Sequence, residues 1–265
     1  AMYRNSTEAK ETVALHKGEW DKEQKKQYKE EMKKKRKRLL IMVLVLNLGI
    51  LVFLKYFNLF AGGLNTLLGF TGVEASVPIL RLFLPLGISF YTFQSTGYLI
   101  DVYREKIVPE TNPAKYALFV SFFPQIIQGP IGFYDQLAHQ LYEEHSFSYK
   151  NLKYGALLML WGYLKKMVIA DRAVSLINTV TADYRQYNGT VILITVLVYA
   201  LQLYADFSGG IDISRGFAEI LGIQMAENFK RPYFAVNIND YWRRWHITLG
   251  AWMKNYVFYS LAMSK

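Results

Sequence analysis

The stretch LLIMVLVLNLGILVFLKYF, from Leu39 to Phe57, decides the class of the fold. It carries one charge, Lys55, and is long enough to cross the hydrocarbon core of a bilayer, which takes about 20 mostly apolar helical residues. Three further stretches are comparably apolar: Pro78 to Ile100, Leu152 to Ala170, and Val191 to Phe207. Because a soluble domain hardly buries four such helices, we expect an all-α, polytopic membrane protein with several transmembrane helices.

A net charge of +10 is concentrated just before the first stretch, where Lys33 to Arg38 read KKKRKR and lead directly into Leu39. Such a run is typical of a patch for nucleic acid or anionic cofactors, or of a topology signal, because basic residues beside a membrane helix stay in the cytoplasm. We favour the topology signal. Residues 1–38 are then a basic cytoplasmic segment that can also contact anionic lipid headgroups, and nucleic acid is not an expected partner.

The loop expected from Asn58 to Val77 contains no Lys or Arg, which predicts that it faces the outer side of the membrane. The returning span, Pro78 to Ile100, is followed by Arg104 and Lys106, which again favours the cytoplasm. The expected location is therefore the cell membrane, crossed several times.

Two further stretches predict broken or re-entrant helices. Tyr116 to Ile131 reads YALFVSFFPQIIQGPI, which is short for a crossing and rich in helix breakers and amides. It is either an ordinary span that ends at a Gly-Pro turn or a broken element, and we predict that Phe122 to Ile131 is not one straight helix. Gly209-Gly210 is expected to end the helix that contains Val191 to Phe207. Tyr241 to Leu261 is expected to form one aromatic helix.

The strongest candidate for chemistry is His246, in NDYWRRWHITLGAW. An ionisable residue at membrane depth is a functional candidate, although a histidine beside tryptophans can also simply anchor a helix at the interface. On one continuous helix it would share a face with Trp242 and Leu249. We also expect Asp240 to pair with Arg244.

A second polar cluster is expected around Asp206 and Asp212, on either side of the Gly break. Their carboxylates are expected to accept hydrogen bonds from Arg243 or Arg244, either as part of a site or as a structural salt bridge. The candidate lining of a substrate channel is Gln128, Asp206, Asp212, Arg243, Arg244 and Trp245.

Several kinds of chemistry lack their signatures. The chain has no cysteine, which excludes thiolate catalysis and thiolate metal sites on it. No phosphate-binding glycine loop, metal-ligand cluster, HExxH or GxSxG motif occurs, so no metal and no bound cofactor are expected. From the residues alone, an enzyme, a broken-helix transporter and a structural membrane scaffold all stay open.

Three blocks resemble the membrane-bound O-acyltransferase family, in the branch that includes alginate O-acetyltransferase and teichoic-acid D-alanyl transfer proteins. The first is PLGISFYTFQSTGYLIDVYRE, from Pro85 to Glu105, and the second is FVSFFPQIIQGPI, from Phe119 to Ile131. The third runs from Tyr204 to Phe258 and contains YADFSGGIDISRG and WRRWH. The three blocks occur in the family's order, and the resemblance extends over roughly residues 39–265.

This resemblance implies a transferase that moves an acyl group, expected to be acetyl, from a cytoplasmic donor to hydroxyls of an extracytoplasmic polysaccharide. The implied co-substrate is acyl-CoA or an acyl carrier protein, and an accessory acetylation protein is a possible partner. D-alanyl transfer to teichoic acid is the alternative within the branch.

Of the family's two site histidines, the resemblance places the first at His246, in a supporting or catalytic role. The second belongs to a WHG motif, which does not occur in this sequence. We therefore expect residues 39–265 to be a partial acyltransferase domain, truncated at its C-terminus and inactive alone.

Overall fold

The computed structural model describes residues 1–16, 19–71 and 76–262, and in these ranges the chain is helical, without β-strands. Residues 72–75 of the expected outer loop and the last three residues of the expected acyltransferase domain lie outside the described ranges. The chain forms two compact units, Ala1–Val120 and Ser121–Lys265. By length and composition, two of the described helices could cross a membrane: α2 (Lys22–Phe70) and α9 (Gly189–Ile220). The expectation of an all-α fold is thus confirmed for the described residues.

Helix α2 carries both the basic segment and the first apolar stretch without a break, over 49 residues. It begins at a capping box, in which Asp21 accepts from the first turn while the Gln24 side chain accepts from the Asp21 amide at 3.0 Å. The expected loop from Asn58 is wrong in its first part, because the helix continues to Phe70. The sequence there is mostly apolar, and its three glycines, Gly62, Gly63 and Gly69, weaken a helix without ending it.

Two asparagines of α2 explain why the chain that returns from it is not helical at first. The Asn58 amide exchanges two hydrogen bonds with the Leu80 backbone, at 2.8 and 2.9 Å. Asn65 does the same with Val77, at 2.9 and 2.6 Å. These side chains satisfy backbone groups that a helix would otherwise pair internally. The span expected from Pro78 to Ile100 is therefore wrong in its first half, since helix α3 covers Ile88–Tyr103.

Helix α1 (Met2–Leu15) packs on α2 and α3, and one carboxylate connects the three helices. Glu105, just beyond α3, accepts hydrogen bonds from Ser6, from Lys10 at 2.6 Å and from Arg36 at 2.7 Å. Arg36 also donates to the carbonyl of Tyr103 at 2.6 Å. The Lys10 and Ser6 donors, together with Arg36, lower the pKa of Glu105 to about 2. One residue of the KKKRKR run therefore makes a structural contact that the topology interpretation did not anticipate.

The stretch rich in prolines and glutamines is broken, as predicted. Helix α4 (Pro113–Ser121) ends before Phe122, whose backbone is not helical (φ −55°, ψ 106°), and α5 (Phe123–Gln128) is a short helix of 6 residues. Pro124 lies in the first turn of α5, where its missing N–H costs nothing. Gly129 then continues in extended conformation. The prediction that Phe122 to Ile131 is not one straight helix is confirmed.

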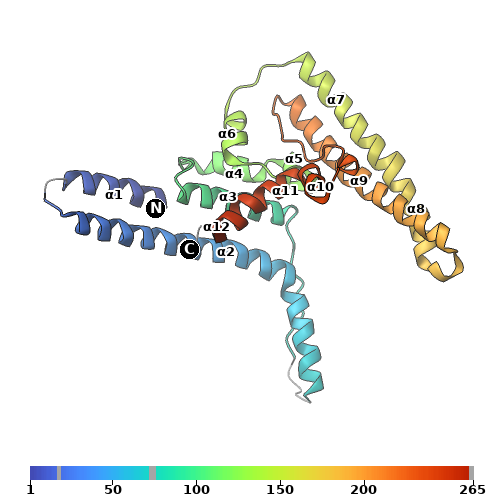
Figure 1. Ribbon diagram of the computed structural model, residues 1–265, viewed down its shortest axis with the longest axis horizontal. Helices are drawn as coiled ribbons and strands as arrows, with labels where there is room; N and C mark the ends of the chain where they lie inside the picture. Colours follow the sequence, from blue (N-terminus) through green and yellow to red (C-terminus); the bar gives the residue numbers. More distant parts are fainter. Residues whose placement is uncertain (17–18, 72–75, 263–265) are drawn as a thin grey trace. The chain divides into compact units, whose positions relative to one another are not determined.

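The second unit is built on a long helical hairpin. Its first arm runs through α7 (Tyr149–Tyr163), the π-helix η1 (Leu164–Ala170) and α8 (Asp171–Ala182), and its second arm is α9. Figure 1 shows α7 and α9 side by side, and α9 also packs on η1 and α8. The other described elements of this unit are α6 (Tyr134–Tyr142), η2 (Tyr184–Gln186), η3 (Pro232–Phe234), α10 (Ile238–Arg244), α11 (Ile247–Trp252), η4 (Met253–Phe258) and α12 (Tyr259–Ala262).

Glycines allow the two arms of the hairpin to approach backbone to backbone. A Cβ atom on Gly162 would lie 2.7 Å from the carbonyl oxygen of Gly209, and one on Gly209 would lie 2.9 Å from that of Gly162. Gly155 and Gly216 form a second crossing of the same kind, two turns along each helix. Small residues at the contact are typical of close helix pairs in membranes, because they let the backbones approach.

The expected break at Gly209-Gly210 is wrong, because α9 is one helix of 32 residues. The physical reason is that both glycines are buried against neighbouring elements. Gly209 packs on Gly162, and Gly210 packs on the Gln128 side chain, whose amide would have to move to admit a Cβ atom. Their role is therefore close packing, and helix packing offsets the low helix propensity of the pair.

This packing predicts that Gly162→Ala destabilises the protein, whereas Gly63→Ala does not. The added methyl group at position 162 meets backbone oxygen, which cannot move aside, and such overpacking costs about 1–3 kcal/mol. Gly63 has no neighbouring atom within 4 Å, so alanine there meets open space. Thermal unfolding of the two variants in detergent tests the claim, and equal melting temperatures for both would contradict it.

Candidate active site

A buried ion pair connects the two arms of the hairpin. Lys165 donates to the carboxylate of Asp212 at 2.6 Å and to the hydroxyl of Ser208 at 2.9 Å. The side chains of Lys165 and Asp212 are only 8% and 15% exposed. Lys165 lies in η1, and single π-helical turns within α-helices occur frequently at functional sites. A charge in such surroundings must be paired, because its desolvation is otherwise not compensated.

The next residue makes a second ion pair along the same seam. Lys166 pairs with Asp206 and, at 3.5 Å, with Asp171. The expectation that Asp206 and Asp212 accept from Arg243 or Arg244 is therefore wrong. Because α9 continues without a break, its two carboxylates face the adjacent lysines of η1. The Lys166–Asp206 pair is more exposed than Lys165–Asp212, with side chains 39% and 32% accessible, and is suited to hold the two arms of the hairpin together.

The buried pair lies on the wall of a polar cavity of about 560 Å³, named here the inner cavity. Its lining comes from α7 and η1, from α9, and from the loop of residues 227–231 together with Arg244. Basic side chains outnumber carboxylates on this wall. The charged lining residues are Lys165, Asp212, Arg215, Glu227, Lys230, Arg231 and Arg244. Of the residues predicted for the channel, Asp212 and Arg244 line this cavity.

The helix expected from Tyr241 is interrupted at Trp245 and His246, which corrects the expected shared face of Trp242, His246 and Leu249. Helix α10 ends at Arg244, and His246 is the N-cap of α11 with a left-handed backbone (φ 46°, ψ 54°). Two backbone hydrogen bonds hold the break in place. The Lys230 amide donates to the Arg244 carbonyl at 2.9 Å, and the Ile247 amide donates to the Asn228 carbonyl at 3.0 Å.

Hydrogen bonds between buried polar side chains also fix the turn at His246. The Asn228 side-chain oxygen accepts from the amide and the hydroxyl of Thr248, at 2.9 and 2.8 Å. The Thr248 hydroxyl in turn accepts from the Ile131 amide at 3.1 Å. Loop 227–231, helix α11 and the segment after α5 are thereby fixed to one another. Pairing with these partners, which are distant in sequence, explains why the local helical pattern around His246 is overridden.

The His246 imidazole is half-buried and packs edge-on against Phe207 of α9, with ring centroids 4.8 Å apart. Its Nδ1 atom is buried and has no hydrogen-bond partner among the described residues. His246 lies outside α2 and α9, the two described helices long enough to cross a membrane. Burial lowers its pKa below the usual value for histidine. Burial thus favours the neutral form of the ring, which is the form able to accept a proton. It is not among the residues that line the inner cavity, although Asn228 and Phe229 beside its turn are.

The remaining residues predicted for the substrate channel make contacts of different kinds. Arg244 pairs with Asp240 at 2.9 Å, as expected, and this hydrogen bond lowers the pKa of Asp240. Trp245 stacks on Tyr241 with ring centroids 5.7 Å apart, and Arg243 is exposed. Gln128 packs on Gly210. The structure therefore brings Asp212 and Arg244 to one cavity, and the other predicted residues are not part of its lining.

Sequence reasoning missed Lys165, Ser208, Arg215 and Asn228. For Lys165 a signal was present, since Lys165 and Lys166 are the only charges near the end of an apolar stretch, and such residues mark functional sites. Asn228 had no comparable signal, because its pairing with Thr248 depends on the tertiary fold. Among the described residues, no group of three or more His, Asp or Glu side chains could hold a metal ion.

The model of the membrane-bound O-acyltransferase family matches residues 19–265. A protein of Pseudomonas aeruginosa named probable alginate O-acetylase is 36% identical over 217 residues, which cover 82% of this chain and 41% of that protein.

Two other relatives have different names. A peptidoglycan O-acetyltransferase of Helicobacter pylori is 34% identical over 244 residues, covering 82% of this chain and 45% of the relative. A teichoic acid D-alanyltransferase of Bacillus subtilis is 31% identical over 180 residues, covering 65% of this chain and 44% of the relative. The chain thus spans about two fifths of the length of the curated relatives it matches. From the extent of the family match and the identity to these relatives, the chain belongs to the membrane-bound O-acyltransferase family.

Proposed function

We propose that this chain is part of a multi-pass enzyme of the cell membrane that acetylates hydroxyls of an extracytoplasmic polysaccharide. The acetyl group comes from a cytoplasmic thioester donor, either acyl-CoA or an acyl carrier protein. Two of the relatives given above support acetylation by their names: the probable alginate O-acetylase, which is the most similar of the three, and the peptidoglycan O-acetyltransferase. D-alanyl transfer to teichoic acid is the alternative, supported by the more distant relative.

The observation that carries this proposal is the inner cavity with its buried ion pair. A structural scaffold has no need for charges at this depth, because well-packed apolar residues are as stable or more stable than a buried ion pair. A cavity of about 560 Å³ is large enough for part of a small-molecule substrate. A transporter could also use a polar cavity, so the experiments below measure acyl transfer directly.

His246 has two possible roles in the reaction. As general base, its neutral imidazole takes the proton from the acceptor hydroxyl while that oxygen attacks the thioester carbonyl. The carbon–sulfur bond then breaks, and the thiolate leaves and takes up a proton. As a supporting residue, it orients the acceptor or tunes a second histidine. Its position on a turn fixed by Asn228, beside the cavity and not in its lining, favours the supporting role.

We propose that the basic half of α2 faces the cytoplasm and that its C-terminal end faces outward. The opposite orientation would leave the KKKRKR run on the side where such runs are rare. The partners in this arrangement are the bilayer, the polysaccharide acceptor and an acyl-carrier or accessory acetylation protein.

Membrane-impermeant thiol labelling tests the orientation, since the chain contains no cysteine of its own. Lys26→Cys and Thr66→Cys place exposed thiols at the two ends of α2. In intact cells, position 66 is expected to react and position 26 to react only after permeabilisation. The reverse pattern would overturn the proposed topology.

For His246, the test is acyl transfer by the full-length enzyme carrying His246→Ala. Loss of a supporting residue is expected to lower transfer about 10- to 100-fold, by analogy with residues that orient metal ligands. Loss of a general base lowers it about 10²- to 10⁴-fold.

His139→Ala is the matched control, because His139 is exposed on α6. Both variants must reach normal abundance in the membrane, and the control is expected to transfer normally. Normal transfer by His246→Ala at normal abundance would leave this histidine only an anchoring role.

A further inference from the structure

The first amide groups of α11 are capped by a residue that is distant in sequence. In most helices the side chain at the N-cap position accepts a hydrogen bond from the second or third amide of the helix. His246 occupies this position in α11, but its side chain makes no such bond within the described part of the chain. Asn228 takes its place: its backbone carbonyl accepts from the first amide, of Ile247, and its side-chain oxygen accepts from the second, of Thr248. The imidazole of His246 therefore has no part in capping α11.

The orientation of the Asn228 side chain follows from the groups around it. The Thr248 amide can only donate, so the Asn228 atom that faces it must be the oxygen. The Thr248 hydroxyl accepts from the Ile131 amide at 3.1 Å and donates its own hydrogen to the same oxygen of Asn228, at 2.8 Å. Asn228 and Thr248 are only 1% and 3% exposed. The hydrogen bonds from Ile131 through Thr248 to Asn228 thus run in one direction and are shielded from water.

Two features of this turn carry a cost in free energy. The His246 backbone is left-handed, with φ 46°, which is unfavourable for a residue that has a Cβ atom. The Asn228 Nδ2 atom is buried without a hydrogen-bond partner among the described residues. Strained backbone persists only where the surrounding structure over-determines it, and it is found most often at functional sites. The cap that Asn228 provides supplies this constraint.

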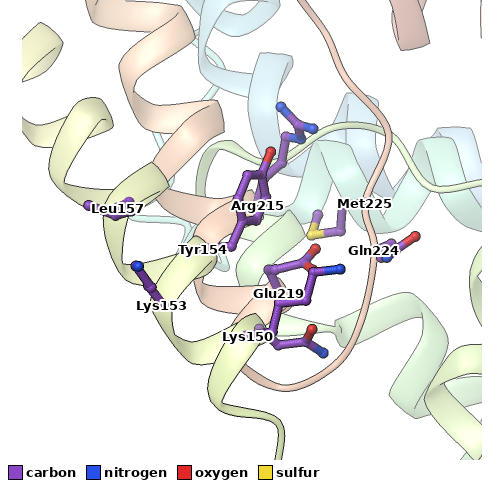
Figure 2. Close-up of a pocket in the computed structure, with 9 residues that line it drawn as sticks. Lys150, Lys153, Tyr154, Leu157, Arg215, Glu219, Gln224 and Met225 are labelled. Atoms are coloured by element: carbon purple, nitrogen blue, oxygen red, sulfur yellow. The ribbon is translucent and has the colours of Figure 1, made fainter.

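The connection that carries Asn228 is itself held on both sides. Before Asn228, the Gln224 backbone exchanges two hydrogen bonds with the Gln140 side chain of α6, at 2.8 and 3.3 Å. Figure 2 shows Gln224 on this connection, which follows α9. After Asn228, the Lys230 amide donates to the Arg244 carbonyl at 2.9 Å. Asn228 is therefore fixed in place where it caps α11.

We propose that Asn228 and Thr248 are positioning residues for His246, which hold its imidazole in place by capping α11 in its stead. The imidazole packs edge-on against Phe207 of α9, and the cap fixes the turn from which it projects. The consequence for acyl transfer rests on the proposed function, whereas the placement of the ring does not. Both residues act through His246, and neither has to touch a substrate.

Thr248→Val and Thr248→Ser form a matched pair of variants. Valine keeps the shape of the side chain and the backbone amide, but it removes the hydroxyl that connects Ile131 with Asn228. Serine keeps the hydroxyl. In the full-length enzyme, at equal membrane abundance, Thr248→Val is expected to lower acyl transfer about 10-fold, because small displacements of a positioned group are costly. Thr248→Ser is expected to transfer at close to the normal rate.

A double-mutant cycle with His246→Ala separates positioning from a merely structural role. If Thr248 acts through the imidazole, Thr248→Val lowers transfer no further once His246 is replaced by alanine. An equal fold loss in both backgrounds would mean that Thr248 acts independently of His246, and it would overturn the proposal.

Modification by diethyl pyrocarbonate gives a readout that does not depend on acyl transfer. The reagent acylates neutral imidazole, and peptide mass spectrometry resolves His246 from His139, an exposed reference on α6. Relative to His139, His246 is expected to react about 3- to 10-fold faster in Thr248→Val, which corresponds to the loss of one hydrogen bond that holds the turn. Thr248→Ser is expected to leave the rate unchanged.

Asn228→Ser withdraws the cap oxygen by shortening the side chain and is expected to give the same faster reaction, so the test does not depend on one variant. An unchanged reaction rate of His246 in both Thr248→Val and Asn228→Ser overturns the proposal. Absence of acyl transfer by the unmodified full-length protein, alongside faster reaction in these variants, would contradict the proposed function and leave the positioning of the ring standing.

Discussion

The second unit depends on one interaction, the buried ion pair between Lys165 and Asp212. Both charges are largely removed from water, and each is compensated chiefly by the other, at 2.6 Å. This requirement fixes the register of η1 against α9. The glycine crossings at Gly162 and Gly209 then bring the two backbones close enough for the pair to form. The inner cavity is the space that this register leaves beside the turn of residues 227–231.

In both units, polar side chains form hydrogen bonds with backbone groups that are not paired within a helix. In the first unit, Asn58 and Asn65 pair with the extended chain that returns from α2. In the second unit, Asn228 and Thr248 fix the left-handed turn at His246. Irregular backbone at membrane depth is stable only where protein groups or water satisfy it. Such turns are therefore positions where a polar side chain can be held rigidly beside a cavity.

The sequence was sufficient to predict the helical class, the apolar stretches, the break before α5 and the family, because these follow from local composition and motifs. The break at Gly209-Gly210 was predicted wrongly, because the sequence alone does not distinguish a glycine pair that ends a helix from one that packs closely against a neighbouring helix. The partners of Asp206 and Asp212 were also missed. Their pairing with Lys166 and Lys165 depends on the register of two helices some 40 residues apart, which local patterns do not encode.

The proposed acyl transfer requires the inner cavity, which the Lys165–Asp212 pair maintains. The most direct measurement compares Lys165→Met, Asp212→Leu and the double variant in the full-length enzyme, by membrane abundance and by acyl transfer. Asp212→Leu leaves the buried Lys165 without its carboxylate and is expected to lose about 3–5 kcal/mol of stability. Lys165→Met leaves Asp212 with Arg215 alone, at 3.6 Å, and is expected to lose less. The double variant is expected to recover abundance, because an apolar pair of similar volume tolerates burial, while transfer stays abolished. Normal transfer by the double variant would show that the reaction does not depend on this ion pair.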